Sequence, residues 1–71
     1  MSVITITPGE HTSIDKATVI ADALIAKGLV KEYRPVIELG DSIEVIPVDG
    51  ADRTEIMQVF IDAKFNVLEK D

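Results

Sequence analysis

The chain has 71 residues, of which 46% are hydrophobic, a composition typical of one small globular domain rather than of a disordered chain. It contains no cysteine, which excludes disulfides and thiolate metal sites. Its formal net charge of -6 repels nucleic-acid phosphates, so direct DNA or RNA binding is not expected. Because domains of this size are often stabilised by association, we expect a homo-oligomer.

The first residues lack the basic segment and the long apolar core of a signal peptide. The apolar runs of the chain are also far shorter than the roughly 18 residues that suggest a membrane span. The sequence therefore predicts a cytoplasmic protein that does not act at a membrane.

Residues 3 to 7 alternate β-branched apolar and hydroxyl side chains, which predicts a strand whose Ile4 and Ile6 point into the core. Residues 12 to 15 have the spacing of a capping box with Thr12 as the first member, so a helix is expected from there to Lys27, closed by Gly28. One face of that helix is apolar, and its predicted core residues are Ile14, Ala17, Ile20, Ala21, Leu24 and Ile25.

Residues 29 to 48 consist of short alternating segments interrupted by Gly40 and Asp41, which predicts a hairpin. Pro35 cannot donate a ladder hydrogen bond, so the first arm is expected to be an edge strand. A second helix should begin after Asp52, which has the spacing of an N-cap, and end near Lys64. Its apolar stripe comprises Ile56, Val59, Phe60 and Ala63, and residues 66 to 69 are expected to form the last strand.

The order strand, helix, strand, strand, helix, strand is that of the split βαβ, ferredoxin-like α+β fold, or α-β plait. It predicts a single domain over residues 1–71, with a four-stranded antiparallel sheet in spatial order 4-1-3-2 and both helices on one face. Because this fold serves many unrelated functions, it does not by itself indicate an activity.

Alternation also predicts which residues lie on the uncovered face of the sheet. That face should carry aliphatic side chains rimmed by charge, a pattern more typical of a protein interface than of an RNA-binding sheet with aromatic and basic residues. The predicted interface residues are Val36, Glu38, Glu44, Ile46, Val48 and Leu68. Two alternatives remain open: isolated surface aliphatics are normal, and a register error of one residue would turn a whole strand over.

His11 is the only histidine, and with Glu10 it lies in the loop after the first predicted strand. A metal site needs three or four convergent ligands, so we expect an exposed loop histidine and neither a metal nor a cofactor. Heavy-metal-binding domains of this fold carry two cysteines in that loop, and this chain has none. No nucleophile and base pair can be nominated, so an enzyme is not expected.

Pro8 and Gly9, directly after the first strand, resemble the start of ACT domains, regulatory modules of this fold that bind amino acids where two copies meet. The resemblance implies a ligand site at Pro8, Gly9, Glu10 and His11. A Pro-Gly turn also occurs without any ligand.

These observations favour a non-enzymatic protein-interaction module that dimerises or docks on a partner. Its acidic charge suggests a basic partner surface, and one specific form is an inhibitor that presents carboxylates in place of phosphates, as a nucleic-acid mimic. The alternatives are an ACT-like small-ligand-binding regulatory domain and, third, a minor enzymatic or metal-handling role around His11.

Overall fold

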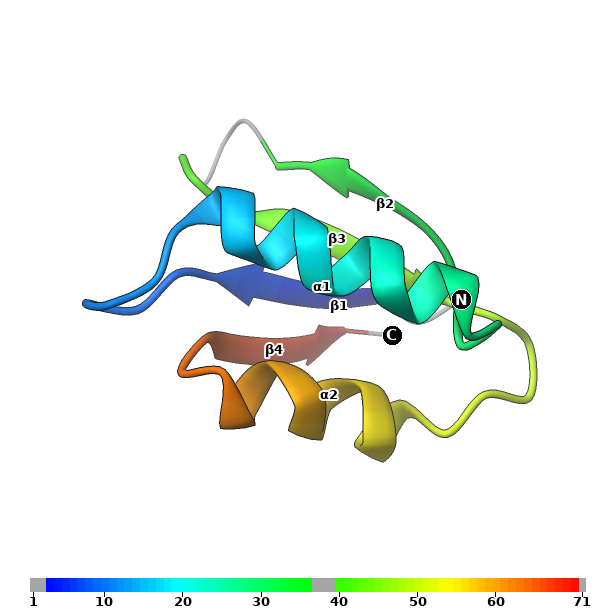
Figure 1. Ribbon diagram of the computed structural model, residues 1–71. Coiled ribbons are helices and arrows are strands. Elements are labelled where there is room, and N and C mark those ends of the chain that lie inside the picture. The colour runs from blue at the N-terminus through cyan, green and yellow to red at the C-terminus, as the bar shows by residue number, and fades with distance from the viewer. Residues whose placement is uncertain (1–2, 37–39, 71) are drawn as a thin grey trace.

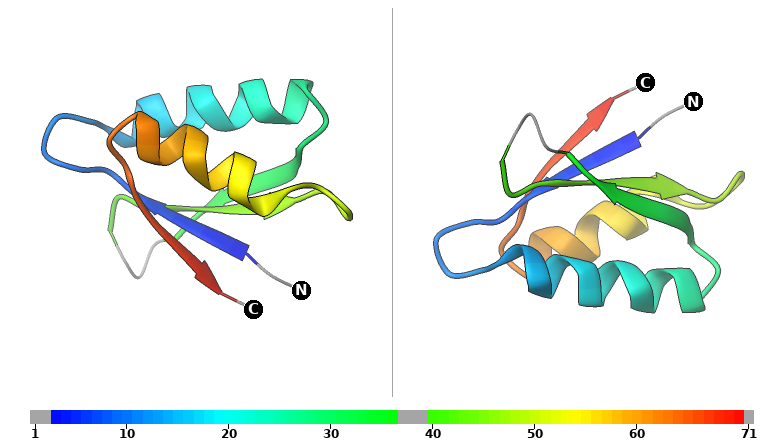
Figure 2. Two further views of the ribbon diagram at one scale, coloured as in Figure 1. Left: turned by 90° about the horizontal axis from the view of Figure 1, so that it is seen from below. Right: turned by 90° about the horizontal axis from the view of Figure 1, so that it is seen from above.

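The computed structural model of the protein describes residues 3–36 and 40–70. In chain order the elements are β1 (Val3–Thr7), α1 (Ile14–Ala26), β2 (Val30–Pro35), β3 (Ile43–Pro47), α2 (Arg53–Asp62) and β4 (Asn66–Lys70). The four strands form one antiparallel sheet in the order β2-β3-β1-β4, and both helices lie on the same side of it (Figures 1 and 2). The ferredoxin-like fold expected from the sequence is confirmed.

The register of the central strands explains where the core lies. Ile4 of β1 pairs with Val45 of β3, and Ile6 pairs with Ile43, so the alternate apolar residues of both strands point toward the helices. All four side chains are buried in the hydrophobic core. The predicted alternation of β1 and β3 is therefore correct, and no strand is turned over.

Helix α1 packs on β2 and β3. The small side chains of Ala17 and Ala21, on the face of the helix that meets the sheet, are fully buried. It ends as expected at a glycine: Gly28 has a φ of 80°, and the amide of Leu29 donates to the carbonyl of Leu24. The predicted capping box is wrong, since the N-cap is Ser13 and its side chain makes no capping hydrogen bond. The hydroxyl of Thr12 instead accepts a hydrogen bond from the amide of Gly9.

One member of the predicted apolar stripe of α1 is not a core residue. Ile25 is exposed, whereas Leu24 beside it is buried. The stripe predicted from the sequence is thus wider than the surface that the sheet covers.

Helix α2 begins where the sequence predicts, because the Asp52 carboxylate accepts hydrogen bonds from the amides of Thr54 and Glu55. Its buried Phe60 meets Phe65, the residue before β4, edge to face, with ring centroids 5.9 Å apart. The helix ends one residue before the C-cap Ala63, and Lys64 takes the left-handed conformation with a φ of 74°. The amide of Phe65 donates to the carbonyl of Phe60, which closes the turn into β4.

Tyr33 connects the edge strand β2 to α1. Its ring packs against the core, and its hydroxyl faces Asp22 of the helix. Partial burial, the negative charge of Asp22 and a hydrogen bond to that carboxylate raise the pKa of the Tyr33 hydroxyl. Tyr33 of β2 and Asp22 of α1 are thus near neighbours across the edge of the sheet and the helix layer.

Among the described residues, neither helix is both long enough and apolar enough to cross a membrane.

Candidate functional site

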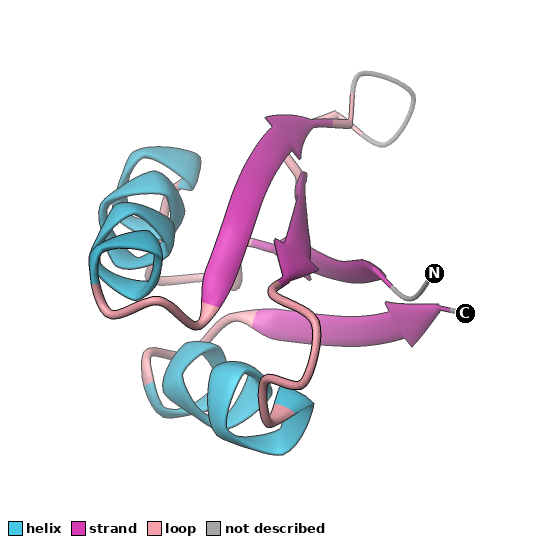
Figure 3. Cartoon of the chain, turned by 90° about the vertical axis from the view of Figure 1, so that its right-hand side faces the viewer, coloured by secondary structure: helices cyan, strands magenta, loops and turns pink. Residues whose placement is uncertain are grey.

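The face of the sheet that carries no helix, which we call the open face, is the first candidate site. It is seen edge-on in Figure 3, on the side of the strands away from both helices. The strand pairing places one row of side chains straight across its middle. From β4 to β2, that row consists of Leu68, Thr5, Glu44 and Arg34.

The charges on the described part of the open face are balanced. Arg34 lies opposite Glu44 on the neighbouring strand, and its guanidinium is 4.0 Å from the Glu32 carboxylate. At the other edge, Lys70 pairs with Val3 on the same face. Opposite charges on adjacent strands favour the sheet by a modest amount and leave no field of a single sign here. The acidic excess of the chain therefore lies outside the described part of this face.

The predicted interface aliphatics do not form one patch. Leu68 is 57% exposed, as expected, but it lies on β4, whereas the half-buried Val36 follows β2 at the opposite edge. Three strand spacings separate those edges, or about 14 Å. The expectation that Val36, Ile46 and Leu68 cluster outward is wrong for this reason.

Ile46 differs from expectation in exposure rather than in direction. It pairs with Glu32 on the open face, next to the core residue Val45, yet only 6% of it is exposed. Ile46 lies on β3, a central strand that has β2 on one side and β1 on the other. Ile46 therefore contributes to stability more than to a free contact surface.

The remaining predicted interface residues have mixed positions. Glu44 is half-buried in the central row. Val48 is 36% exposed just after β3, where its amide donates to the carbonyl of Leu29. Glu38 lies outside the described residues.

Hydroxyl groups lie on the open face at Thr5, in the central row, and at the end of β1, where Thr7 meets Ser42. Thr5 and Ser42 are both buried, and the Ser42 hydroxyl lies 3.0 Å from the hydroxyl of Thr7. The alternation of residues 3 to 7 contained this signal, because every second residue after Val3 is a threonine.

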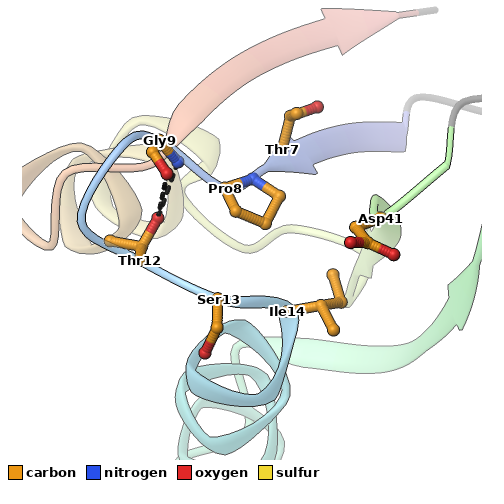
Figure 4. A pocket seen from close by; sticks show the side chains of 7 residues that line it. All are labelled: Thr7, Pro8, Gly9, Thr12, Ser13, Ile14 and Asp41. Carbon is orange, nitrogen blue, oxygen red and sulfur yellow. Dashed lines mark hydrogen bonds between the residues drawn. The ribbon is translucent and has the colours of Figure 1, made fainter.

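The second candidate is a pocket of about 400 Å³ at the end of β1, beside the start of α1 (Figure 4). Its lining consists of Thr7, Pro8, Gly9, Thr12, Ser13, Ile14 and Asp41. The hydrogen bond between Gly9 and Thr12 holds one wall, and Figure 4 places Asp41 on the opposite side. Asp41 belongs to the hairpin turn, so only the fold brings it to this loop.

Gly9 has a steric role in this loop. A Cβ atom at this position would lie 2.6 Å from the carbonyl oxygen of Lys64, which is closer than van der Waals contact allows. The β1 to α1 loop is therefore packed against the turn between α2 and β4. This contact explains the glycine without requiring a ligand.

Of the four residues implied by the ACT resemblance, the pocket includes two. Pro8 and Gly9 line it, whereas Glu10 and His11 are exposed and are not part of the lining. Within residues 3–36 and 40–70, no three histidine, cysteine or acidic side chains converge in a way that could hold a metal ion.

Comparison with protein-family models, curated protein sequences and solved structures finds no match to this chain.

Proposed function

We propose that this chain is a non-enzymatic protein-interaction module whose open face contacts a partner protein. The observation that carries the proposal is that both helices cover one face of the sheet and leave the other face open. The open face exposes Leu68 in the same row as the oppositely charged Glu44 and Arg34. An apolar side chain surrounded by polar and charged groups on a flat surface is typical of small, non-obligate interfaces. The same module is proposed to self-associate.

The more specific proposal, that the chain is an inhibitor of a basic or nucleic-acid-binding surface, requires exposed carboxylates. Because the charges of the described open face are balanced, the carboxylates that replace phosphates must come from loops and helices. The segment from Asp49 to Glu55 holds three exposed carboxylates against one arginine, Arg53. In this form, a basic partner surface is therefore proposed to contact this segment rather than the charge-balanced open face.

The experiment is affinity capture from an extract of the source cell, with the purified wild type and two variants. Arg34→Glu reverses the charge at the β2 end of the central row of the open face, and Val19→Ser alters a residue of α1 that is 67% exposed on the helix side. We expect Arg34→Glu to weaken binding of the captured protein by about tenfold, which corresponds to about 1.4 kcal/mol. Val19→Ser should bind normally. Equal capture by Arg34→Glu and the wild type would exclude the open face as the contact surface.

The ACT-like ligand-binding function remains a second proposal because the pocket beside Gly9 contains two of the residues that the resemblance implies. A ligand that binds only the folded chain raises the melting temperature by mass action. We expect any amino acid that binds there to raise the melting temperature of the wild type and of Glu10→Ala, but not of Asp41→Ala. A panel of twenty amino acids without any shift would reject this function.

A further inference from the structure

The two edges of the sheet differ in their ability to pair with another strand. At β2, Pro35 lacks an amide hydrogen, and the register shifts between Val30 and Glu32, so the ladder there is irregular. Both features are common ways of preventing edge-to-edge association. At β4, every residue pairs in turn with β1, from Asn66 opposite Thr7 to Lys70 opposite Val3, and the strand contains no proline. The β4 edge is thus regular in its pairing and has neither of these two features.

The geometry of a two-fold axis restricts how two copies of β4 can meet. Suppose that two sheets join into one sheet with their open faces on the same side. Directly opposed side chains must then point to the same face. Under a two-fold axis this is possible only if one residue of β4 lies directly opposite the same residue of the other copy. Use of all five strand residues places Leu68 opposite Leu68. The other pairs are then Asn66 with Lys70 and Val67 with Glu69.

The charges of β4 suit this arrangement. No like charges oppose one another in the Leu68-centred register, whereas an axis at Glu69 would place two carboxylates together. Glu69 is already paired with Arg53 of α2, with 3.4 Å between the guanidinium and the carboxylate oxygen. The exposed Leu68 of each copy would cover that of the other. For a chain with a net charge of -6, this edge is a site where two copies meet without direct repulsion.

We propose that two copies of this chain associate through antiparallel pairing of their β4 strands, centred on Leu68, to form a continuous eight-stranded sheet. The inference rests on the self-association included in the proposed function and adds its site and register. The capture experiment changes Arg34 on the opposite edge strand, β2, and therefore tests a different part of the sheet.

Engineered cysteines test the register directly, because the chain has none of its own. Leu68→Cys should form a disulfide dimer under mild oxidation, since directly opposite residues of an antiparallel pair lie within reach of a disulfide. Asn66→Cys and Lys70→Cys should each remain mostly without a disulfide cross-link alone but should cross-link when the two variants are mixed. Each position is opposite the other, and two copies of the same one lie about 13 Å apart along the strands. Val19→Cys, on the exposed side of α1, is the control that should not cross-link.

Sedimentation of the unmodified chain tests the association itself. We expect a concentration-dependent dimer, and Leu68→Lys should raise its dissociation constant by about tenfold or more because it places like charges opposite one another. Circular dichroism should show that this variant is folded, as expected for a side chain exposed to 57%.

The outcomes separate the possible failures. A wild type that is monomeric at every concentration would overturn the self-association and this inference together, and would leave β4 free for a strand of another protein. A dimer that ignores Leu68→Lys, or in which Asn66→Cys and Lys70→Cys do not cross-link preferentially, would overturn only the β4 interface. Neither result would affect the capture experiment with Arg34→Glu.

Discussion

The two faces of the sheet are made from the same strands, but their side chains are buried for different reasons. On the helix-covered face, Ile4, Ile6 and Val45 are buried because α1 and α2 cover them. On the open face, Thr5 and Ile46 are nearly as buried without any helix above them. Both residues belong to central strands, which have a neighbouring strand on each side. Low exposure in a central strand therefore does not by itself identify a layer above the sheet.

The largest expected effect is on the helix-covered face. Phe60 is fully buried between α2 and the sheet and contacts Phe65, so Phe60→Ala should lower the free energy of unfolding by about 3–5 kcal/mol through lost apolar burial and a cavity. Urea unfolding measures this change. Leu68→Ala on the open face is the control, measured at a concentration low enough for the chain to be monomeric, with an expected loss below about 0.5 kcal/mol. Similar losses for both variants would contradict the distinction between the two faces.

Ile46→Ala tests the buried part of the open face. Its side chain is 6% exposed but has no helix above it, so we expect a loss of about 2 kcal/mol, at the low end for a buried isoleucine. Val36→Ala, at a half-buried position beyond β2, should cost less than about 1 kcal/mol. If Ile46→Ala leaves the urea midpoint unchanged, the neighbouring strands do not provide the burial described above.

Asp52→Ala tests how strongly the helix layer depends on its own capping. The substitution leaves the amides of Thr54 and Glu55 without their acceptor, and we expect a loss of about 1 kcal/mol. Asp52→Asn retains an acceptor oxygen and should recover most of that loss. Ser13→Ala, at the N-cap of α1, should have a smaller effect because the Ser13 side chain makes no capping hydrogen bond.

The smallest effect concerns the link from the edge strand to the helix layer. Because the folded state raises the pKa of Tyr33, it holds this proton more tightly than the unfolded chain does. The contribution to stability is thus fully present below the unfolded pKa of about 10 and is lost as the pH rises through the folded value. Tyr33→Phe should remove this component of the stability decrease above about pH 10, as measured by urea unfolding at several pH values. Tyr33 is the only tyrosine, so its absorbance reports the titration directly.

Local patterns in the sequence determined much of this fold. Alternation in residues 3 to 7 and 43 to 47 indicates which side chains face the helices, because the period of a strand depends only on its own backbone. The positions of Asp52 and Gly28 marked a helix start and a helix end for similarly local reasons. Pro35 indicated an edge strand, since a proline cannot donate to a ladder.

Other properties were decided only by the tertiary structure. Thr12 has the spacing of a capping residue, but its hydroxyl accepts a hydrogen bond from the amide of Gly9, in a loop that packs against the distant Lys64. Asp41 is brought to the pocket by the hairpin, and Val36 and Leu68 are separated by the order of the strands. The physical reason is the same in each case: a repeating pattern specifies the direction of a side chain, whereas its neighbours depend on how distant segments are placed across the sheet.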